Sequence, residues 1–167
     1  MKIRKITLFA ILATILFIQE QLLSFLPNIQ CTVLLIILYT KVLGIIPTSI
    51  IVTIHVLLDS IFNASLTPLI SIPMLLGWLL IPITLGTIFK NAKKPLILAL
   101  FSVLYSVCYS VFFLITKWLF LDVNIIAYLI SDIPFIILLA GSSFISVLWL
   151  FTPLYNLLSN LLNQIKD

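Results

Sequence analysis

Long apolar segments that contain almost no charge dominate this sequence. The run at residues 32–43 has Lys41 as its only charged residue, and the run at residues 133–151 has no charged residue. Over the whole chain 63% of the residues are hydrophobic and 8% are charged, whereas about 25% of the residues of soluble domains are charged. So much apolar surface requires the lipid bilayer as its solvent.

The same segments indicate helices. A backbone in lipid has to form its hydrogen bonds within a helix or a closed β-barrel. Barrel strands alternate apolar and polar residues, and the runs at residues 33–38 and 133–140 do not alternate. The sequence therefore predicts an all-α membrane protein with a single integral membrane domain over residues 1–167. We expect six transmembrane helices, at about residues 6–25, 29–43, 45–62, 68–89, 95–116 and 134–151.

Proline and glycine mark the limits of these spans. Pro68, Pro95 and Pro134 stand at expected helix starts, where the missing N–H of proline loses no hydrogen bond. Gly44 separates the second span from the third. These two spans are about 23 and 27 Å long, which is shorter than a hydrocarbon core of about 30 Å. We therefore expect neighbouring helices to shelter them, or the bilayer to be thinner there.

Two segments flank the sixth span. Residues 117–131 mix Trp118, Asp122 and Asn124 with apolar residues, and we expect an outer loop or a short interfacial helix there. Residues 153–165 place leucines at helical spacing opposite asparagines and serines. Such a stripe is typical of a helix that lies on a membrane or docks on a partner helix. It is equally compatible with an extension of the sixth span.

Lysine and arginine predict the orientation, because basic residues are enriched in cytoplasmic loops. With both termini in the cytoplasm, eight of the nine basic residues lie inside and only Lys117 lies outside. These basic residues on the cytoplasmic side account for the net charge of +4, so the charge does not require a nucleic-acid partner.

The acidic residues gather at the outer side in this orientation. Glu20, Asp59 and Asp132 lie in the outer half of the membrane, and His55 is one helical turn from Asp59. Ionisable groups inside a membrane face one another or a water-filled cavity, and they mark functional sites. We take these four as candidate substrate-binding residues, together with the polar and aromatic residues Asn28, Gln30, Trp78, Tyr105 and Tyr109.

Each of these candidates also has a purely structural interpretation. His55 and Asp59 can pair with each other and hold helices together. Asp132 can be the N-cap of the sixth span, which Pro134 then begins. The aromatic residues can serve packing alone, and Glu20 can lie at the headgroup level without a role.

The sequence lacks the motifs of an enzyme. The single histidine excludes a two-histidine zinc site, and there is no G-x-S-x-G, no H-E-x-x-H and no phosphate-binding glycine loop. We therefore expect no catalytic residue, no metal and no cofactor. The predicted cytoplasmic loops are too short to bind ATP, so a partner has to supply the energy if this chain moves a solute.

The order of these features resembles a known family. The stretch at residues 26–30, Leu-Pro-Asn-Ile-Gln, is followed by Gly44 and then by Asp59 late in the third span. The stretch at residues 128–135 is followed by Gly141 and Pro153. Both patterns resemble the substrate-binding S component of energy-coupling factor (ECF) transporters, the vitamin importers of bacteria and archaea.

This resemblance implies a substrate-capture subunit in the plasma membrane of a bacterium. Such a subunit captures a vitamin-like micronutrient in an outer pocket, which the loop between the first two helices covers. It then associates with a membrane coupling subunit and two ATPases. Ala10, Ala13 and Thr14 are similar to the family's A-x-x-x-A motif, with Thr14 in place of the second alanine. They would pack on the coupling subunit, because small residues let helix backbones approach closely.

The charge of the predicted pocket restricts its ligand. Carboxylates disfavour a dense anion, because like charges repel strongly where they are poorly hydrated. A cationic, heteroaromatic or corrinoid-like ligand is favoured, such as pyridoxine, thiamine, a queuosine precursor, or a corrinoid or its ribazole precursor. Two other functions stay open: a ligand-free membrane assembly subunit, and a small intramembrane enzyme that uses His55, Asp59 and Glu20.

Overall fold

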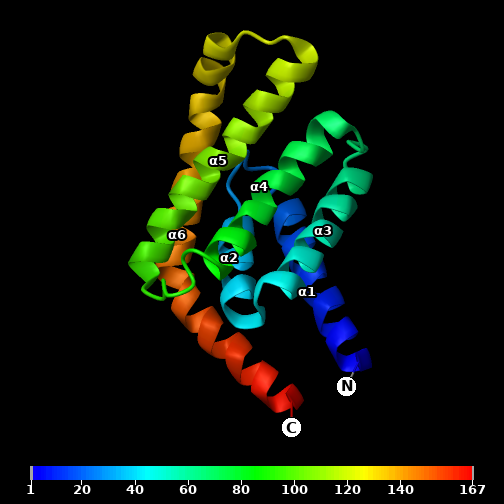
Figure 1. The fold of residues 1–167 in the computed structure, drawn as a ribbon, viewed down its shortest axis with the longest axis vertical. Helices are drawn as coiled ribbons and strands as arrows, with labels where there is room; N and C mark the ends of the chain where they lie inside the picture. Colours follow the sequence, from blue (N-terminus) through cyan, green and yellow to red (C-terminus); the bar gives the residue numbers. More distant parts are fainter. Residues whose placement is uncertain (1, 167) are drawn as a thin grey trace.

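The computed structural model describes residues 2–166, and it describes side chains from residue 6 to residue 164. Those residues form an all-α fold of six helices, as the sequence predicts (Figure 1). The basic side chains at positions 2, 4, 5 and 166, which entered the predicted orientation, lie outside the described side chains. The helices are α1 (Lys2–Leu22), α2 (Thr32–Leu43), α3 (Ile45–Phe62), α4 (Pro68–Gly86), α5 (Pro95–Leu121) and α6 (Ile125–Lys166).

The shortest helix, α2, occupies the centre of the bundle. It contacts α1, α3, α4, α5 and α6, and every residue from Thr32 to Thr40 is buried. Twelve residues make a helix only about 18 Å long. The prediction that neighbours shelter this short segment is confirmed.

A glycine reverses the chain between α2 and α3. Gly44 has φ +89°, a backbone conformation that other residues rarely adopt. Its N–H bonds to the Thr40 carbonyl at the end of α2, and its own carbonyl accepts a hydrogen bond from Thr48 Oγ1 in α3. One residue therefore ends one helix and begins the next, as the sequence predicts.

The connection between α5 and α6 differs most from the prediction. Residues 117–131 are not a loop, because α5 continues to Leu121 and α6 begins at Ile125. Asp122 ends α5 in the left-handed conformation, with φ 52°, and Asn124 Oδ1 caps α6 by accepting the Ala127 N–H. Asp122 and Asn124 stand at the helix ends, and they do not indicate a long loop.

The start of the sixth span is also a correction. Pro134 lies inside α6, and so does Asp132, which is therefore not an N-cap. Proline is tolerated within membrane helices because neighbouring groups can satisfy the freed backbone carbonyl. The α5–α6 hairpin consequently extends past the rest of the bundle at the end away from the termini (Figure 1).

The C-terminal stripe is an extension of the sixth span. Helix α6 runs without a break through Pro153. Leu158 is buried, and Leu154 and Leu162 pack against the core of the bundle, whereas Leu157 and Leu161 are exposed. Residue 165, the last of the predicted stripe, lies outside the described side chains.

The outer surface of the bundle is apolar. Helices α3 to α6 are long and apolar enough to cross a membrane, whereas α2 and the apolar part of α1, Ile6–Leu22, are shorter. Isoleucines and tryptophan are exposed on the faces that point away from the core, for example Ile46, Ile88 and Trp149. An exposed apolar surface of this extent is a membrane-facing one. These features indicate a multi-pass membrane protein, and both chain ends lie at the same end of it (Figure 1).

Candidate functional site

Two polar cavities lie toward the end of the bundle opposite the chain termini. The first has a volume of about 280 Å³ and is called the acidic chamber here, because Glu20 and Asp59 line it. The second has a volume of about 230 Å³ and is called the hairpin chamber, because α5 and α6 supply most of its walls. Asn28 and Tyr109 line both chambers. The two spaces are therefore neighbours that share one wall.

Asp59 is held in the acidic chamber by two amides. Gln21 Nε2 donates a hydrogen bond of 2.9 Å to Asp59 Oδ1, and Asn63 Nδ2 donates one of 2.7 Å to the same oxygen. Among the described residues none donates to Oδ2 of Asp59. One carboxylate oxygen is thus fixed by the protein, and the other is available to a ligand. Gln21 and Asn63 are not among the predicted site residues, although each lies within one helical turn of a predicted acid.

His55 pairs with Glu20 and not with Asp59. The imidazole is 0% exposed, and its Nε2 lies 3.0 Å from Glu20 Oε2. This is the one ion pair among the described residues when His55 is protonated. It joins the last turn of α1 to α3, one turn before Asp59, and His55 does not line the chamber. The predicted alternative, in which His55 and Asp59 pair along one helix face, is not what the structure contains.

The α1–α2 connection is anchored at its C-terminal side by Gln19. Gln19 Oε1 accepts the Cys31 N–H at 2.9 Å, and Gln19 Nε2 donates to Thr32 Oγ1 at 2.7 Å. Thr32 Oγ1 in turn donates to Gln30 Oε1 at 2.9 Å. Gln30 is therefore a buried wall of the acidic chamber whose carbonyl oxygen is already bonded.

Asn28 connects this same segment to α6. It has φ 58°, a left-handed conformation that asparagine tolerates better than most residues. Its Nδ2 donates to the Phe135 carbonyl at 3.3 Å, and its own carbonyl lies 3.4 Å from Ser142 Oγ. The segment at residues 23–31 thereby bridges α1 and α6, and it closes one side of the acidic chamber.

Tyr109 forms the shared wall from the α5 side. Its ring stacks on Trp78 of α4, with 4.1 Å between the centroids and 23° between the planes. Gly77 makes this approach possible, because a Cβ at that position would lie 2.6 Å from Tyr109 Cδ2. Trp78 is fully buried and lines neither chamber. It supports Tyr109, which among the described residues is the one aromatic side chain that lines both chambers.

The hairpin chamber is lined by Lys117 and Tyr128, from the segment at residues 117–131, and by Asp132 next to that segment. Ser110 Oγ hydrogen-bonds to Asp132 Oδ2 across the α5–α6 hairpin. Lys117 Nζ lies 4.8 Å from the centre of the Tyr128 ring, which is cation–π distance. Asp132 is thus brought beside the other candidates as a chamber wall. Lys117 and Tyr128 are not among the predicted site residues. Their placement on the same side of the hairpin as Asp132 can be predicted only when α5 and α6 are known to continue through this segment.

Tyr105 is not brought to either chamber. It lies one helical turn from Tyr109 on α5, and its hydroxyl is 2.7 Å from Thr84 Oγ1 on α4. The side chain is buried and contributes to the packing between α4 and α5. Its position supports a structural role.

The small residues of α1 divide between two faces. Ala10 and Thr14 are exposed, and Thr14 Oγ1 bonds back to the Ala10 carbonyl at 2.8 Å. Ala13 is only 1% exposed and belongs to the buried core. A docking face on α1 can therefore include Ala10 and Thr14, but it cannot include Ala13 while the bundle is intact.

The chambers offer carboxylates, amides, two phenols and one lysine, which are groups that bind and orient a polar ligand. Among the described residues there is no group of three or more His, Cys, Asp and Glu side chains that could hold a metal ion. Comparison of the chain with protein-family models, with curated proteins and with solved structures found no match.

Proposed function

We propose that this chain is the substrate-capture subunit of an ATP-driven micronutrient importer of the ECF type. The observation that carries the proposal is a half-open polar chamber, with two carboxylates in its wall, inside a bundle whose outer surface is apolar. Asp59 is only 4% exposed, yet one of its oxygens is left without a partner among the described residues. Ionisable groups placed this way in a membrane protein mark a ligand site more often than a structural contact.

The chamber's chemistry selects a small ligand that donates hydrogen bonds. Asp59 Oδ2 accepts them, Glu20 adds negative charge, and Tyr109 supplies a ring face on which a heteroaromatic group can stack. Pockets for drug-sized ligands start at about 300 Å³, so a volume of about 280 Å³ fits a compact amine-bearing ring. This volume favours a vitamin of one or two rings over a corrinoid.

The rest of the transport cycle requires partners. Both chain ends lie at one end of the bundle (Figure 1). The chambers are lined by residues at the end of α1, at the end of α3 and in the α5–α6 hairpin, which lie toward the other end. With the termini in the cytoplasm, the chambers face outward and receive substrate from outside the cell. The described connections between helices are short, so a membrane coupling subunit and two ATPases supply the energy. The bilayer concerned is the bacterial plasma membrane.

The first prediction is that the purified protein retains its ligand. Capture proteins need high affinity, and a tightly held compound survives purification. Mass spectrometry of small molecules released by denaturation should find one vitamin-like compound at close to one per chain. A protein that releases no such compound, and whose thermal stability does not respond to a panel of vitamins, would favour the ligand-free assembly subunit.

The second prediction separates capture from coupling. Ala10→Leu and Thr14→Leu place bulk on the exposed face of α1 and should abolish uptake by whole cells, because the coupling subunit can no longer approach closely. The amount of ligand retained by the purified variant should stay at the wild-type level. Ala127→Leu, which adds the same bulk at an exposed position of α6, is the matched control and should transport normally. Loss of retained ligand in the α1 variants would contradict a docking role.

A further inference from the structure

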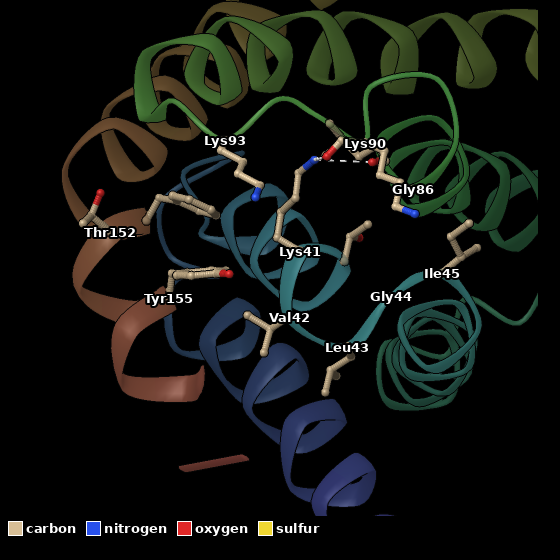
Figure 2. Close-up of a pocket in the computed structure, with 13 residues that line it drawn as sticks. Lys41, Val42, Leu43, Gly44, Ile45, Gly86, Lys90, Lys93, Thr152 and Tyr155 are labelled. Carbon is tan, nitrogen blue, oxygen red and sulfur yellow. Dashed lines mark hydrogen bonds between the residues drawn. The ribbon is translucent and has the colours of Figure 1, made fainter. Parts of the chain in front are cut away.

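A cavity of different character lies away from the two chambers, on the side of the chain termini. It has a volume of about 630 Å³ and lies where the end of α2 and the end of α4 meet α6. We call it the lysine cavity, because Lys41, Lys90 and Lys93 line it. Figure 2 shows the Lys93 amine and the Tyr155 hydroxyl directed into this space from different elements.

The lysine cavity carries positive charge that no described carboxylate balances. The carboxylates that the structure describes are Glu20, Asp59, Asp122 and Asp132, and none of them lines it. The one ion pair of the described residues is the distant pair of Glu20 and His55. Ammonium groups that face one space repel each other, so an anion in this cavity relieves that repulsion.

Lys41 has a structural task that the other two lysines do not share. Its Nζ donates to the Leu85 carbonyl in the last turn of α4 at 3.4 Å, and to the Phe89 and Lys90 carbonyls in the turn that follows at 3.0 and 3.3 Å. Carbonyls at a helix C-terminus lack partners within the helix, and a lysine is favourable there. Lys90 and Lys93 are exposed, and no described group pairs with their amines. These two are the cations that a ligand can use.

Much of the remaining wall of the cavity is apolar, and this limits which anions fit the site. Val42, Leu43, Ile45 and Phe151 line the cavity together with the lysines. A small hydrated anion gains nothing from such a wall, whereas a phospholipid presents a phosphate and a hydrocarbon chain together. Basic pockets between membrane helices on the cytoplasmic side are the sites that bind anionic headgroups.

We propose that the lysine cavity binds the headgroup phosphate of an anionic phospholipid, from the leaflet on the side of the chain termini. Lys90 and Lys93 provide the charge, Tyr155 provides a hydroxyl donor, and the apolar wall receives the first part of an acyl chain. This site is separate from the acidic chamber, so it does not depend on the proposed capture function.

The test compares two lipids on the full-length protein in a mild detergent. Fluorescently labelled phosphatidylglycerol and phosphatidylcholine are titrated, and binding is followed by fluorescence anisotropy. The wild-type protein should bind phosphatidylglycerol more tightly than phosphatidylcholine. The double variant Lys90→Gln, Lys93→Gln should bind phosphatidylglycerol about 30-fold more weakly, since each lysine near a lipid phosphate contributes about 1 kcal/mol and 1.4 kcal/mol is about tenfold. Its affinity for phosphatidylcholine should not change.

The control variant is Lys94→Gln. It removes the same charge one residue further along the chain, at a position that does not line the cavity, and it should leave both affinities within about twofold of the wild type. An equal loss in Lys94→Gln, or equal binding of the two lipids by the wild type, would overturn the proposal. Excess inorganic phosphate at matched ionic strength identifies the source of the anion. If it displaces the phosphatidylglycerol more than sodium chloride does, the site takes free phosphate and the assignment to a lipid is wrong.

Discussion

Asp59→Asn should reduce ligand capture by about 10- to 100-fold and leave the fold intact. The two amide donors, Gln21 and Asn63, both bond to Asp59 Oδ1. An asparagine carbonyl oxygen can accept the same two hydrogen bonds, so the contacts that hold α1 and α3 together survive. The change replaces only Oδ2, which turns from a charged acceptor into a neutral donor. A hydrogen bond to a charged group contributes about 1.5–3 kcal/mol, and this range corresponds to the expected loss.

The measurement is the amount of co-purified ligand per chain, with whole-cell uptake as the second readout. Asp122→Asn is the matched control, because it removes a carboxylate from the turn between α5 and α6, where asparagine tolerates the left-handed backbone. It should bind and transport like the wild type. Glu20→Gln should also lower capture, but its lost contact with His55 also weakens the link between α1 and α3. Wild-type ligand content in Asp59→Asn would remove Asp59 from the site.

The features that were predicted correctly depend on single residues. Pro68 and Pro95 occupy the first turns of α4 and α5, and Gly44 turns the chain between α2 and α3. A proline without an N–H and a glycine with positive φ act through their own backbone geometry. No knowledge of neighbouring helices is needed to place them. The same rule predicts a helix start at Pro134. Pro134 instead lies inside α6, because the helix around it continues in spite of the lost hydrogen bond.

The meeting of Glu20 and Asp59 at one end of the bundle was also predictable, but their partners were not. Successive helices run in opposite directions, so the ends of α1 and α3 meet, and Glu20 and Asp59 reach one chamber. Which side chain faces which depends on the rotation of each helix about its axis. That rotation pairs His55 with Glu20. It also turns Tyr109 to both chambers, while Tyr105, one turn away, bonds to Thr84. The sequence predicts this rotation poorly, because a helix that is apolar on every side has no apolar stripe to mark its buried face.

Gly77→Ala should lower ligand capture about tenfold and destabilise the bundle by about 1–3 kcal/mol, the usual range for added bulk in a packed core. The new Cβ would lie 2.6 Å from Tyr109 Cδ2 and 3.3 Å from Tyr109 Cα. The tyrosine ring therefore has to leave its stack on Trp78. Tyr109 is the wall between the acidic and hairpin chambers, so its displacement changes the shape of both. Stacking on an aromatic ring contributes about 0.5–1.5 kcal/mol, which at its upper end is a tenfold change in affinity.

Gly141→Ala distinguishes this contact from a general intolerance of alanine in these helices. A Cβ at position 141 meets nothing within 4 Å, and alanine favours a helix over glycine, so this variant should be at least as stable as the wild type and bind normally. Thermal unfolding in detergent and retained ligand are measured for both variants. The double variant Gly77→Ala, Tyr109→Ala relieves the overlap, so its destabilisation should be smaller than the sum of the two single changes. Additive destabilisation in this cycle would show that the alanine at position 77 does not act by displacing Tyr109. Normal capture by Gly77→Ala would show that the position of Tyr109 does not define the ligand site.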